Sequence, residues 1–205
     1  MDFLKSVMVS ALGYDLTWLE FFAFITSVIG VALGVYGPRK TWYWWNLSSL
    51  LYALLFYQQK YYASALLQFI FIAGGIWGWF GWGKEGAKPE KLTKLNRALG
   101  IMTYLILWLA LYPVLKHIGA AASLTDAFGF VGSCMVQLLM VKEKYEAWPI
   151  WLIVDSVYTY QFWQGKNYLT SILYLIFVVI AVAGWRRWLR ESSRTPQGEI
   201  GRAHV

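Results

Sequence analysis

Seven apolar stretches, each long enough to cross a lipid bilayer as a helix, follow one another along this chain of 205 residues. A helix that spans about 30 Å of hydrocarbon needs roughly 20 mostly apolar residues. Apolar residues make up 59% of the chain and charged residues only 14%, which is more apolar than a water-exposed globule can accommodate. We therefore predict an all-α integral membrane protein with spans at residues 18–36, 42–58, 62–82, 97–116, 124–141, 148–164 and 168–189.

The Lys and Arg residues divide unevenly between the two sides of the membrane that seven spans create. The side that holds the N-terminus receives 4 of them and the other side receives 14. Because cytoplasmic loops carry the excess of Lys and Arg, we predict the N-terminus outside and the C-terminus in the cytoplasm. The same interpretation accounts for the net charge of +7 without nucleic acid as a partner. The four outer cations are Lys5, Lys60, Lys116 and Lys166.

Segments outside the spans have their own patterns. Residues 1–17 are predicted to form a short helix at the membrane interface, since they lack the pattern of a signal peptide. Residues 83–123 comprise a charged cytoplasmic loop and the linker helix. The polar residues 191–205, with Pro196 and Gly198, are predicted to be a disordered cytoplasmic tail.

The sequence repeats itself with a constant offset of 106 residues and no gaps. We call two residues that are 106 positions apart repeat mates. Chance matches are common between Leu-rich helices, but Trp, Tyr and Lys residues in the same register are not. The repeated units are residues 18–82 and 124–190. Their mates include Trp42 and Trp148, Trp45 and Trp151, Tyr52 and Tyr158, Lys60 and Lys166, Phe71 and Phe177, Gly78 and Gly184, Trp79 and Trp185, and Trp82 and Trp188.

The repeat predicts a geometry as well as a count of helices. Each unit holds three spans, an odd number, so the single linker span between the units makes both of them point the same way. Parallel repeats of this kind place a substrate site at their interface, near the middle of the bilayer. The resulting arrangement of seven transmembrane helices, two parallel three-helix repeats plus a linker helix (3+1+3), is similar to that of the SWEET sugar transporters.

Asp155 is the only carboxylate well inside a predicted span. An acid at the centre of a membrane helix costs roughly 3 kcal/mol on insertion scales, so it requires a polar partner, a cationic ligand or a proton. On its helix Asp155 shares one narrow face with Trp148, Trp151 and Tyr158. Such a face is expected to point inward, away from lipid.

Other polar and aromatic residues lie on matching inward faces and leave two interpretations open. The amides either bind a ligand or form hydrogen bonds between helices, and the deeper Trp residues either stack on a ligand or pack. Trp42, Trp82, Trp148 and Trp188 lie near span ends and are expected to be interfacial anchors. The candidate substrate-binding residues are Asn46, Gln68, Trp79, Gln137, Asp155, Tyr158, Gln161 and Trp185.

These candidates describe a cavity with aromatic walls, several amides and one acid. Aromatic faces attract planar and cationic groups, whereas amides suit a sugar or a carboxamide, so a flat, cationic heteroaromatic compound with a polyol part fits. A single Cys134 and the scattered His117 and His204 cannot build a metal or haem centre, and we expect no cofactor. We also expect no enzymatic activity, because the spans offer no second titratable group beside Asp155.

The sequence resembles the PnuC family of vitamin transporters over nearly all of residues 18–190. The resemblance rests on Trp-x-x-Trp-x-x-x-Asp, on Gly-Trp-x-x-Trp and on Tyr168 with the preceding Gly165 and Lys166; the first two motifs comprise Trp148, Trp151, Asp155, Gly184, Trp185 and Trp188. It implies a SWEET-like fold, a homotrimer and facilitated diffusion of nicotinamide riboside across the bacterial inner membrane. Uptake would be driven by a cytosolic kinase that phosphorylates the vitamin. Ser49, where the motif has Asn or Asp, departs from the pattern.

Four other functions compete with this one, and each would need a particular feature or substrate. Relatives of this family carry thiamine or riboflavin, so the preferred vitamin is less certain than the family. A sugar carrier would have a Pro hinge in both repeats, and the first and fifth spans have none. A proton-coupled carrier would use Asp155 as its titrating group. An enzyme embedded in the membrane would need a second titratable group near that acid.

Overall fold

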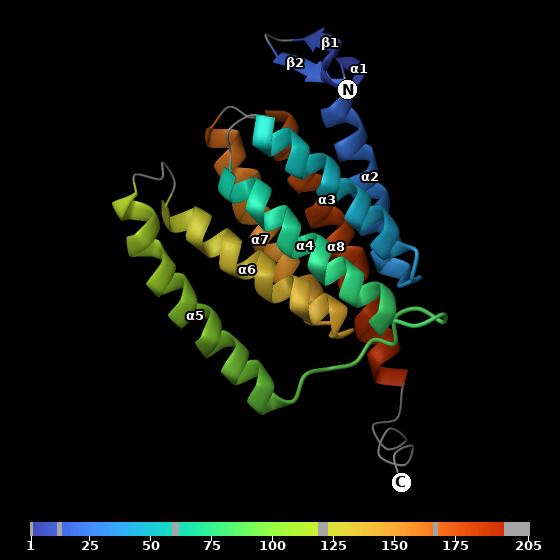
Figure 1. The fold of residues 1–205 in the computed structure, drawn as a ribbon. Coiled ribbons are helices and arrows are strands. Elements are labelled where there is room, and N and C mark those ends of the chain that lie inside the picture. The colour runs from blue at the N-terminus through green and yellow to red at the C-terminus, as the bar shows by residue number, and fades with distance from the viewer. Residues whose placement is uncertain (1, 12–13, 59–61, 119–122, 166–167, 195–205) are drawn as a thin grey trace.

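The computed structural model describes residues 2–11, 14–58, 62–118, 123–165 and 168–194. Within them the chain forms helices and one short hairpin (Figure 1). The elements are α1 (Asp2–Lys5), β1 (Val7–Ala11), β2 (Tyr14–Thr17), α2 (Trp18–Tyr36), α3 (Thr41–Gln58), α4 (Tyr62–Gly81), α5 (Lys94–His117), α6 (Ser123–Val141), α7 (Ala147–Gln164) and α8 (Tyr168–Arg194).

Helices α2 to α8 coincide with the seven apolar stretches of the sequence, so the prediction of an all-helical chain is confirmed apart from the N-terminal hairpin. By length and composition, α2, α5, α6 and α8 are able to cross a membrane, and α4 contains the shorter apolar segment Ala65–Gly81. Helix α8 continues to Arg194, supported by an ion pair between Arg187 and Glu191 one turn apart. The predicted disordered tail is therefore wrong for residues 191–194, and residues 195–205 lie outside the described residues.

Side chains and backbone groups define where the helices begin and end. The hydroxyl of Thr17 accepts a hydrogen bond from the backbone N–H of Glu20 (3.2 Å) and caps α2. Thr93 caps α5 in the same way. Helix α2 ends at Gly37, whose φ of 70° is the left-handed conformation that glycine adopts without strain.

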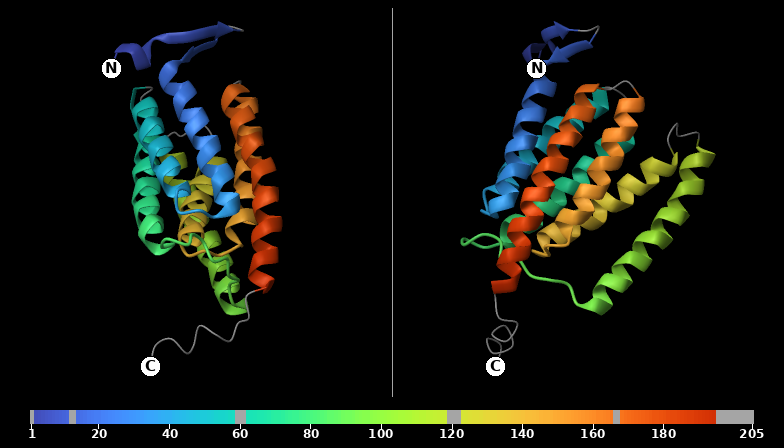
Figure 2. Two further views of the ribbon diagram at one scale, coloured as in Figure 1. Left: turned by 90° about the vertical axis from the view of Figure 1, so that its right-hand side faces the viewer. Right: turned by 180° about the vertical axis from the view of Figure 1, so that it is seen from behind.

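Six of the long helices form a closed ring (Figures 1 and 2). Within each half, neighbouring helices pack in chain order: α2 on α3 on α4, and α6 on α7 on α8. Helix α4 also packs on α6, and α8 packs on α2, which closes the ring. Exchanging α2, α3 and α4 for α6, α7 and α8 reproduces the same set of contacts.

Helix α5 lies outside this ring and packs on α6. Tyr104 and Trp108 of α5 donate hydrogen bonds to the backbone oxygens of Phe128 (3.1 Å) and Leu124 (3.1 Å). No residue of α5 is buried within the chain. Its many exposed apolar side chains therefore face whatever surrounds the protein.

The two ends of the ring differ in structure. The N-terminal hairpin lies at one end, which we call the hairpin end, and the last turn of α8 lies at the other (Figure 1). Residues 82–93, which connect α4 to α5, cross this second end, and we call them the strap. The outer cations Lys60 and Lys166 of the sequence analysis lie outside the described residues.

The N-terminal segment is mainly a hairpin, so the prediction of an interfacial helix over residues 1–17 is wrong. Only Asp2–Lys5 is helical, and β1 pairs with β2 in antiparallel fashion. The β-branched Val7 and Val9 alternate along β1, which favours an extended backbone over a helix. The hairpin is joined to α2 by a hydrogen bond from the N–H of Trp18 to the oxygen of Ser6 (3.2 Å) and by stacking of Phe3 on Trp18.

Four Trp residues near the strap end pack together, and we call them the tryptophan cluster: Trp42, Trp82, Trp148 and Trp188. Ring centroids are 4.7 Å apart for Trp42 and Trp82, 5.8 Å for Trp82 and Trp188, and 5.7 Å for Trp148 and Trp188. Their exposed fractions are 0%, 3%, 1% and 0%. The expectation that they are interfacial anchors is therefore wrong, and they form the core instead.

Glycines on the neighbouring helices make this burial possible. A Cβ on Gly78 of α4 would collide with the ring of Trp42, and a Cβ on Gly184 of α8 would collide with the ring of Trp148. The missing side chains let α3 approach α4 and α7 approach α8 closely enough to enclose the indoles. Trp188 also donates a hydrogen bond to the backbone oxygen of Gly34 (3.2 Å).

The strap joins the α2–α3 connection to the α6–α7 connection. The N–H of Ala87 donates to the oxygen of Gly37 (2.7 Å) on one side. On the other side the N–H of Glu90 donates to the oxygen of Glu143 (2.9 Å), and Glu90 forms an ion pair with Lys144. Burial in this contact raises the pKa of the Glu143 carboxyl above its ordinary value.

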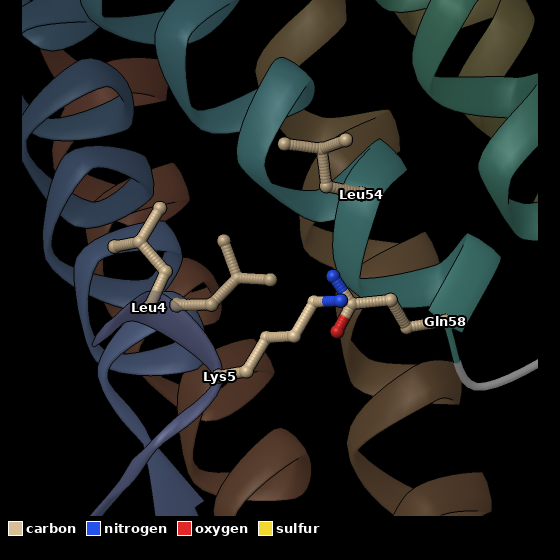
Figure 3. Close-up of a pocket in the computed structure, with 5 residues that line it drawn as sticks. Leu4, Lys5, Leu54 and Gln58 are labelled. Carbon is tan, nitrogen blue, oxygen red and sulfur yellow. The ribbon is translucent and has the colours of Figure 1, made fainter. Parts of the chain in front are cut away.

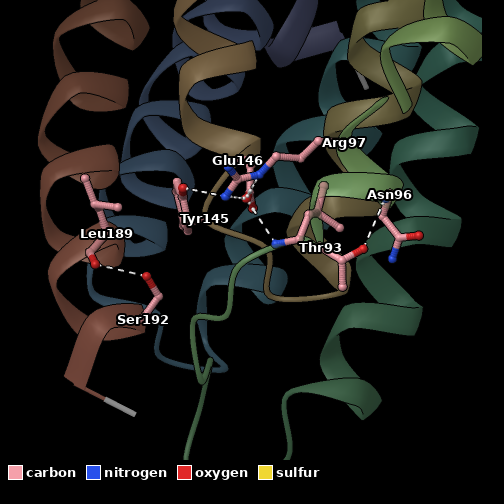
Figure 4. A network of polar contacts seen from close by, with 8 residues as sticks. Thr93, Asn96, Arg97, Tyr145, Glu146, Leu189 and Ser192 are labelled. Atoms are coloured by element: carbon pink, nitrogen blue, oxygen red, sulfur yellow. Dashed lines mark hydrogen bonds and ion pairs between the residues drawn. The ribbon is translucent and has the colours of Figure 1, made fainter. Parts of the chain in front are cut away.

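Glu146 anchors the end of the strap where α5 begins (Figure 4). Its Oε1 accepts hydrogen bonds from the backbone N–H of Leu92 (3.0 Å) and from Nε of Arg97 (2.9 Å). Arg97 also donates to the hydroxyl of Tyr145 (2.8 Å). One carboxylate thus connects the strap, α5 and α7.

Candidate functional site

Two amide side chains, one from each half of the ring, pack against adjacent glycines of α4. Asn46 of α3 places its Oδ1 where a Cβ on Gly75 would stand. Gln137 of α6 occupies the corresponding space at Gly74, where a Cβ would be 2.6 Å from its Nε2. The same Nε2 donates a hydrogen bond to the backbone oxygen of Phe71 (3.3 Å). The Gly74-Gly75 pair therefore lets amides from both halves reach the interface.

Aromatic rings lie at the same interface between the halves. Trp45 of α3 and its repeat mate Trp151 of α7 face each other across the halves, with ring centroids 6.1 Å apart. Phe71 lies 6.5 Å from Trp151, centroid to centroid. Asp155 follows Trp151 by one helical turn on the same face of α7 and is only 2% exposed. Helices α3, α4, α6 and α7 thus bring aromatic, amide and acidic groups together.

Several buried polar atoms of this region have no hydrogen-bond partner within the described part of the chain. Native proteins rarely leave such atoms unpaired, because each one costs the free energy of its lost hydration. Each such atom therefore requires an explanation, and a bound polar ligand is one. We call the residues that carry them the central polar group: Oδ1 of Asn46, Oε1 of Gln137, Nε1 of Trp151 and Oδ1 of Asp155.

Two predicted residues lie nearer the hairpin end. Tyr158 packs on Tyr174 of α8, with ring centroids 4.9 Å apart, and its ring fills the space beside Gly129. Gln161 donates a hydrogen bond from Nε2 to Oδ1 of Asp126 (2.7 Å), while its own Oε1 is buried without a partner among the described residues. These side chains form the hairpin-side boundary of the central polar group.

The predicted Trp79 and Trp185 pack against the larger hydrophobic core to which the tryptophan cluster belongs. The guanidinium of Arg39 covers the Trp79 ring, 4.3 Å from its centroid, and Nε of Arg39 donates to the backbone oxygen of Trp79 (2.5 Å). The last predicted residue, Gln68 of α4, is 8% exposed. The structure thus places Asn46 and Gln137 against adjacent glycines of α4, Asp155 one turn along α7 from Trp151, and the two indoles nearer the strap.

Sequence reasoning missed Trp45 as a candidate and used Trp151 only as a motif residue. The repeat could have identified both as candidates, because Trp45 and Trp151 are repeat mates and both lie on the inward face. The adjacent Gly74 and Gly75, opposite two amides, were a second signal. A glycine pair within a helix allows close helix packing and also makes room for ligand-binding side chains. Only the contacts in the structure distinguish these two roles.

A small pocket lies apart from this region, between α1, α2 and α3 (Figure 3). Leu4, Lys5, Leu19, Leu54 and Gln58 line it, and the polar ends of Lys5 and Gln58 point toward each other. Among the described residues, no group of three or more His, Cys, Asp or Glu side chains is placed to hold a metal ion.

Comparison with known proteins relates this fold to vitamin transporters. A family model described as nicotinamide mononucleotide transporter matches residues 17–190. The chain is 26% identical over 222 residues to the nicotinamide riboside transporter PnuC of Escherichia coli K12, with 93% of each chain covered. It is also 26% identical over 208 residues to the riboflavin/roseoflavin transporter RibM of Streptomyces davaonensis, with 95% of each covered.

A solved structure matches as well. A crystal structure of the vitamin B3 transporter PnuC superposes with a TM-score of 0.73 and 22% identity, over 86% of this chain and 83% of that one. At this identity the likeness shows a common fold.

Proposed function

Because the chain belongs to the nicotinamide mononucleotide transporter family, we propose that it carries nicotinamide riboside across the bacterial cytoplasmic membrane. The relative from Escherichia coli, which is named for this substrate, matches along nearly the whole chain. The observation that carries the proposal is the central polar group, whose buried polar atoms from α3, α6 and α7 have no partner in the described chain. Nicotinamide riboside offers a carboxamide, a ribose and an aromatic ring, the groups that such atoms and indoles bind.

The proposed architecture has seven transmembrane helices in a 3+1+3 arrangement, with α5 as the linker between α2–α4 and α6–α8. The equivalent contacts of the two halves of the ring support it. The hairpin end faces outward and the strap faces the cytoplasm, as the distribution of Lys and Arg indicates. The central polar group then lies near the middle of the bilayer, between parallel repeats, where carriers of this kind bind their substrates.

Within the proposed site the residues have different roles. The amides of Asn46 and Gln137 bind the carboxamide or the ribose, and Asp155 belongs to the same polar group. Gln68, Tyr158 and Gln161 complete the polar lining toward α4 and the hairpin end, and Trp79 and Trp185 supply aromatic surface toward the strap. Removing one hydrogen-bonding partner from a site built for it costs about 1–3 kcal/mol, which is roughly ten- to a hundredfold in affinity.

Transport is proposed to be facilitated diffusion by a homotrimer, with a cytosolic kinase that traps the vitamin by phosphorylation. The exposed apolar surface of α5 provides a face that a neighbouring subunit or lipid covers. The chain itself is proposed to have no enzymatic activity and no cofactor. Its partners are then the substrate, the bilayer and, functionally, the kinase.

Uptake of labelled nicotinamide riboside into liposomes that contain the purified protein tests this function. We expect uptake without a sodium or proton gradient, ending at equal concentrations on both sides. Asn46→Ala and Gln137→Ala should weaken binding ten- to a hundredfold. Asn96→Ala, which removes an exposed amide at the start of α5, is the matched control and should leave binding unchanged. Wild-type binding by both site variants would contradict the proposed site.

Two other functions have specific support and are separated by the same experiment. The similarity to RibM favours a riboflavin carrier, and riboflavin uptake in place of riboside uptake would establish it. Buried Asp155 favours a proton-coupled carrier. Accumulation of substrate above the outside concentration, abolished by an uncoupler, would establish that mechanism and refute facilitated diffusion.

A further inference from the structure

Asp155 is an acid whose charge no described side chain balances. Its carboxyl group is 2% exposed, and its Oδ1 has no hydrogen-bond partner within the described chain. None of the ion pairs between described residues includes it. An isolated buried carboxylate is costly, so a structure that keeps one at this position requires a compensating group.

Cations are absent from the walls around it. Helices α2, α3, α4, α6 and α7 contain no Lys or Arg, and the first one on α8 is Arg186. Gly184 packs on Trp148, seven residues before Asp155, so Arg186 lies beyond that level, at least about 10 Å along the axis from the acid. The phenols of Tyr174 and Tyr158 both interact electrostatically with Asp155.

From this placement we infer that Asp155 makes the site selective for a permanently cationic heteroaromatic ring over a neutral ring of the same shape. The inference rests on the proposed function, because it concerns the ring of the substrate carried at that site. The pyridinium ring of nicotinamide riboside holds its positive charge without a bound proton. It cannot be neutralised by giving a proton to the acid, so the charge pair persists in the low-dielectric interior.

The neighbouring side chains favour the same orientation of the ligand. Trp151, one turn from Asp155, presents an aromatic face of the kind that attracts cations. Ser49, the repeat mate of Asp155, is equally buried at 2% but carries no charge. The charged half of the site therefore belongs to α7. The cationic ring binds there, and the uncharged ribose lies toward the amides of Asn46 and Gln137.

Two forms of one ligand test this inference. Oxidised nicotinamide riboside is a cation, and its dihydro form is neutral with nearly the same shape. Calorimetry on the purified full-length protein should show at least tenfold tighter binding of the oxidised form. Asp155→Asn should weaken binding of the oxidised form ten- to a hundredfold, leave the dihydro form unchanged and bring the ratio of the two affinities close to one.

Two matched controls distinguish the effect of the Asp155 charge from the loss of a hydrogen bond and from a loss of folding. Gln137→Ala should weaken both forms by a similar factor, because an amide does not distinguish their charge. Ser156→Ala, next to Asp155 but exposed on α7, should weaken neither. The thermal midpoint of ligand-free Asp155→Asn should equal or exceed that of the wild type, because the variant removes an uncompensated charge.

The outcomes distinguish this inference from the proposed function. If the wild type binds both forms equally, or if Asp155→Asn weakens both by the same factor, the charge selectivity is wrong while the riboside function stands. If the wild type binds neither form, the riboside function is wrong. The charge test then proceeds with thiamine, a permanent thiazolium cation, against neutral riboflavin, and equal losses of both in Asp155→Asn refute the inference.

Discussion

Gly184 has no side chain at the point where the ring of Trp148 packs against α8. A methyl group there would overlap with the buried indole, and a buried indole cannot move without opening the tryptophan cluster. We expect Gly184→Ala to lower the free energy of unfolding by about 1–3 kcal/mol, the usual cost of overpacking. The thermal midpoint in detergent should fall by about 2–4 °C for each kcal/mol.

Gly100 on α5 provides the matched control for this substitution. A Cβ at Gly100 would meet no atom within 4 Å, and the residue is also helical. Alanine favours a helix more than glycine does, so Gly100→Ala should keep or raise the midpoint. Equal midpoints for the two variants would show that the helices around the cluster separate easily.

The tryptophan cluster shows what the sequence could not reveal about single residues. A Trp near the end of a span is expected to be an interfacial anchor, and Trp42 and Trp188 both lie near span ends. The burial of Trp42 depends on Gly78 of α4, and that of Trp148, another member of the cluster, depends on Gly184 of α8. Asp155 was different, because a carboxylate inside a span has to be inward whatever its neighbours are.

The strap is an element whose attachment depends on the single carboxylate of Glu146. Only 12% of this side chain is exposed, and it accepts hydrogen bonds from the strap and from Arg97. Glu146→Ala leaves the N–H of Leu92 and the guanidinium without their acceptor, and we expect a loss of about 1–3 kcal/mol in the free energy of unfolding. Proteolysis should cut the strap faster in this variant.

Glu85, on the strap itself, is the control. Its ion pair with Lys88 holds the pKa of its carboxyl below the ordinary value, but both side chains are more than 70% exposed. Exposed pairs contribute little to stability because water screens them. Glu85→Ala should therefore leave both the thermal midpoint and the rate of proteolysis unchanged. A similar loss in the two variants would mean that loop charge in general, rather than the Glu146 contact, stabilises the strap.

At the scale of elements the sequence predicts long helices well and short elements poorly. The ends of α3 and α7 lie within one residue of the predicted ones, because loops with Gly, Pro and charges border long apolar runs. The hairpin of β1 and β2 was missed, since segments of five and four residues carry too little periodicity to outweigh the expectation of a helix.

For the whole molecule, the 106-residue repeat predicted which helices are equivalent, and the ring contacts agree with it. The repeat could not predict which helix of one unit meets which helix of the other, because that depends on side-chain packing between the units. The contact of α4 with α6 and of α8 with α2 comes from the structure alone.

The last prediction concerns orientation of the whole chain in the membrane. Ser10 in β1 and Ser193 in the last turn of α8 are both exposed. These two elements end at opposite ends of the molecule (Figure 1). In a Cys134→Ser background, which removes the single native thiol, Ser10→Cys should react with a membrane-impermeant maleimide in intact cells. Ser193→Cys should react only after the cells are permeabilised. This follows because 13 of the 15 Lys and Arg residues that the structure describes lie on the strap side, and cytoplasmic loops retain such charges.

The reverse labelling pattern would place the hairpin in the cytoplasm and contradict the orientation. Labelling of both cysteines in intact cells would mean that the two ends lie on the same side, which an odd number of spans does not allow. That result would contradict the parallel arrangement of the two repeats, because they are parallel only if the linker α5 crosses the membrane. The proposed site between α3, α6 and α7 depends on the same crossing, so this experiment tests the premise from which its position in the bilayer is derived.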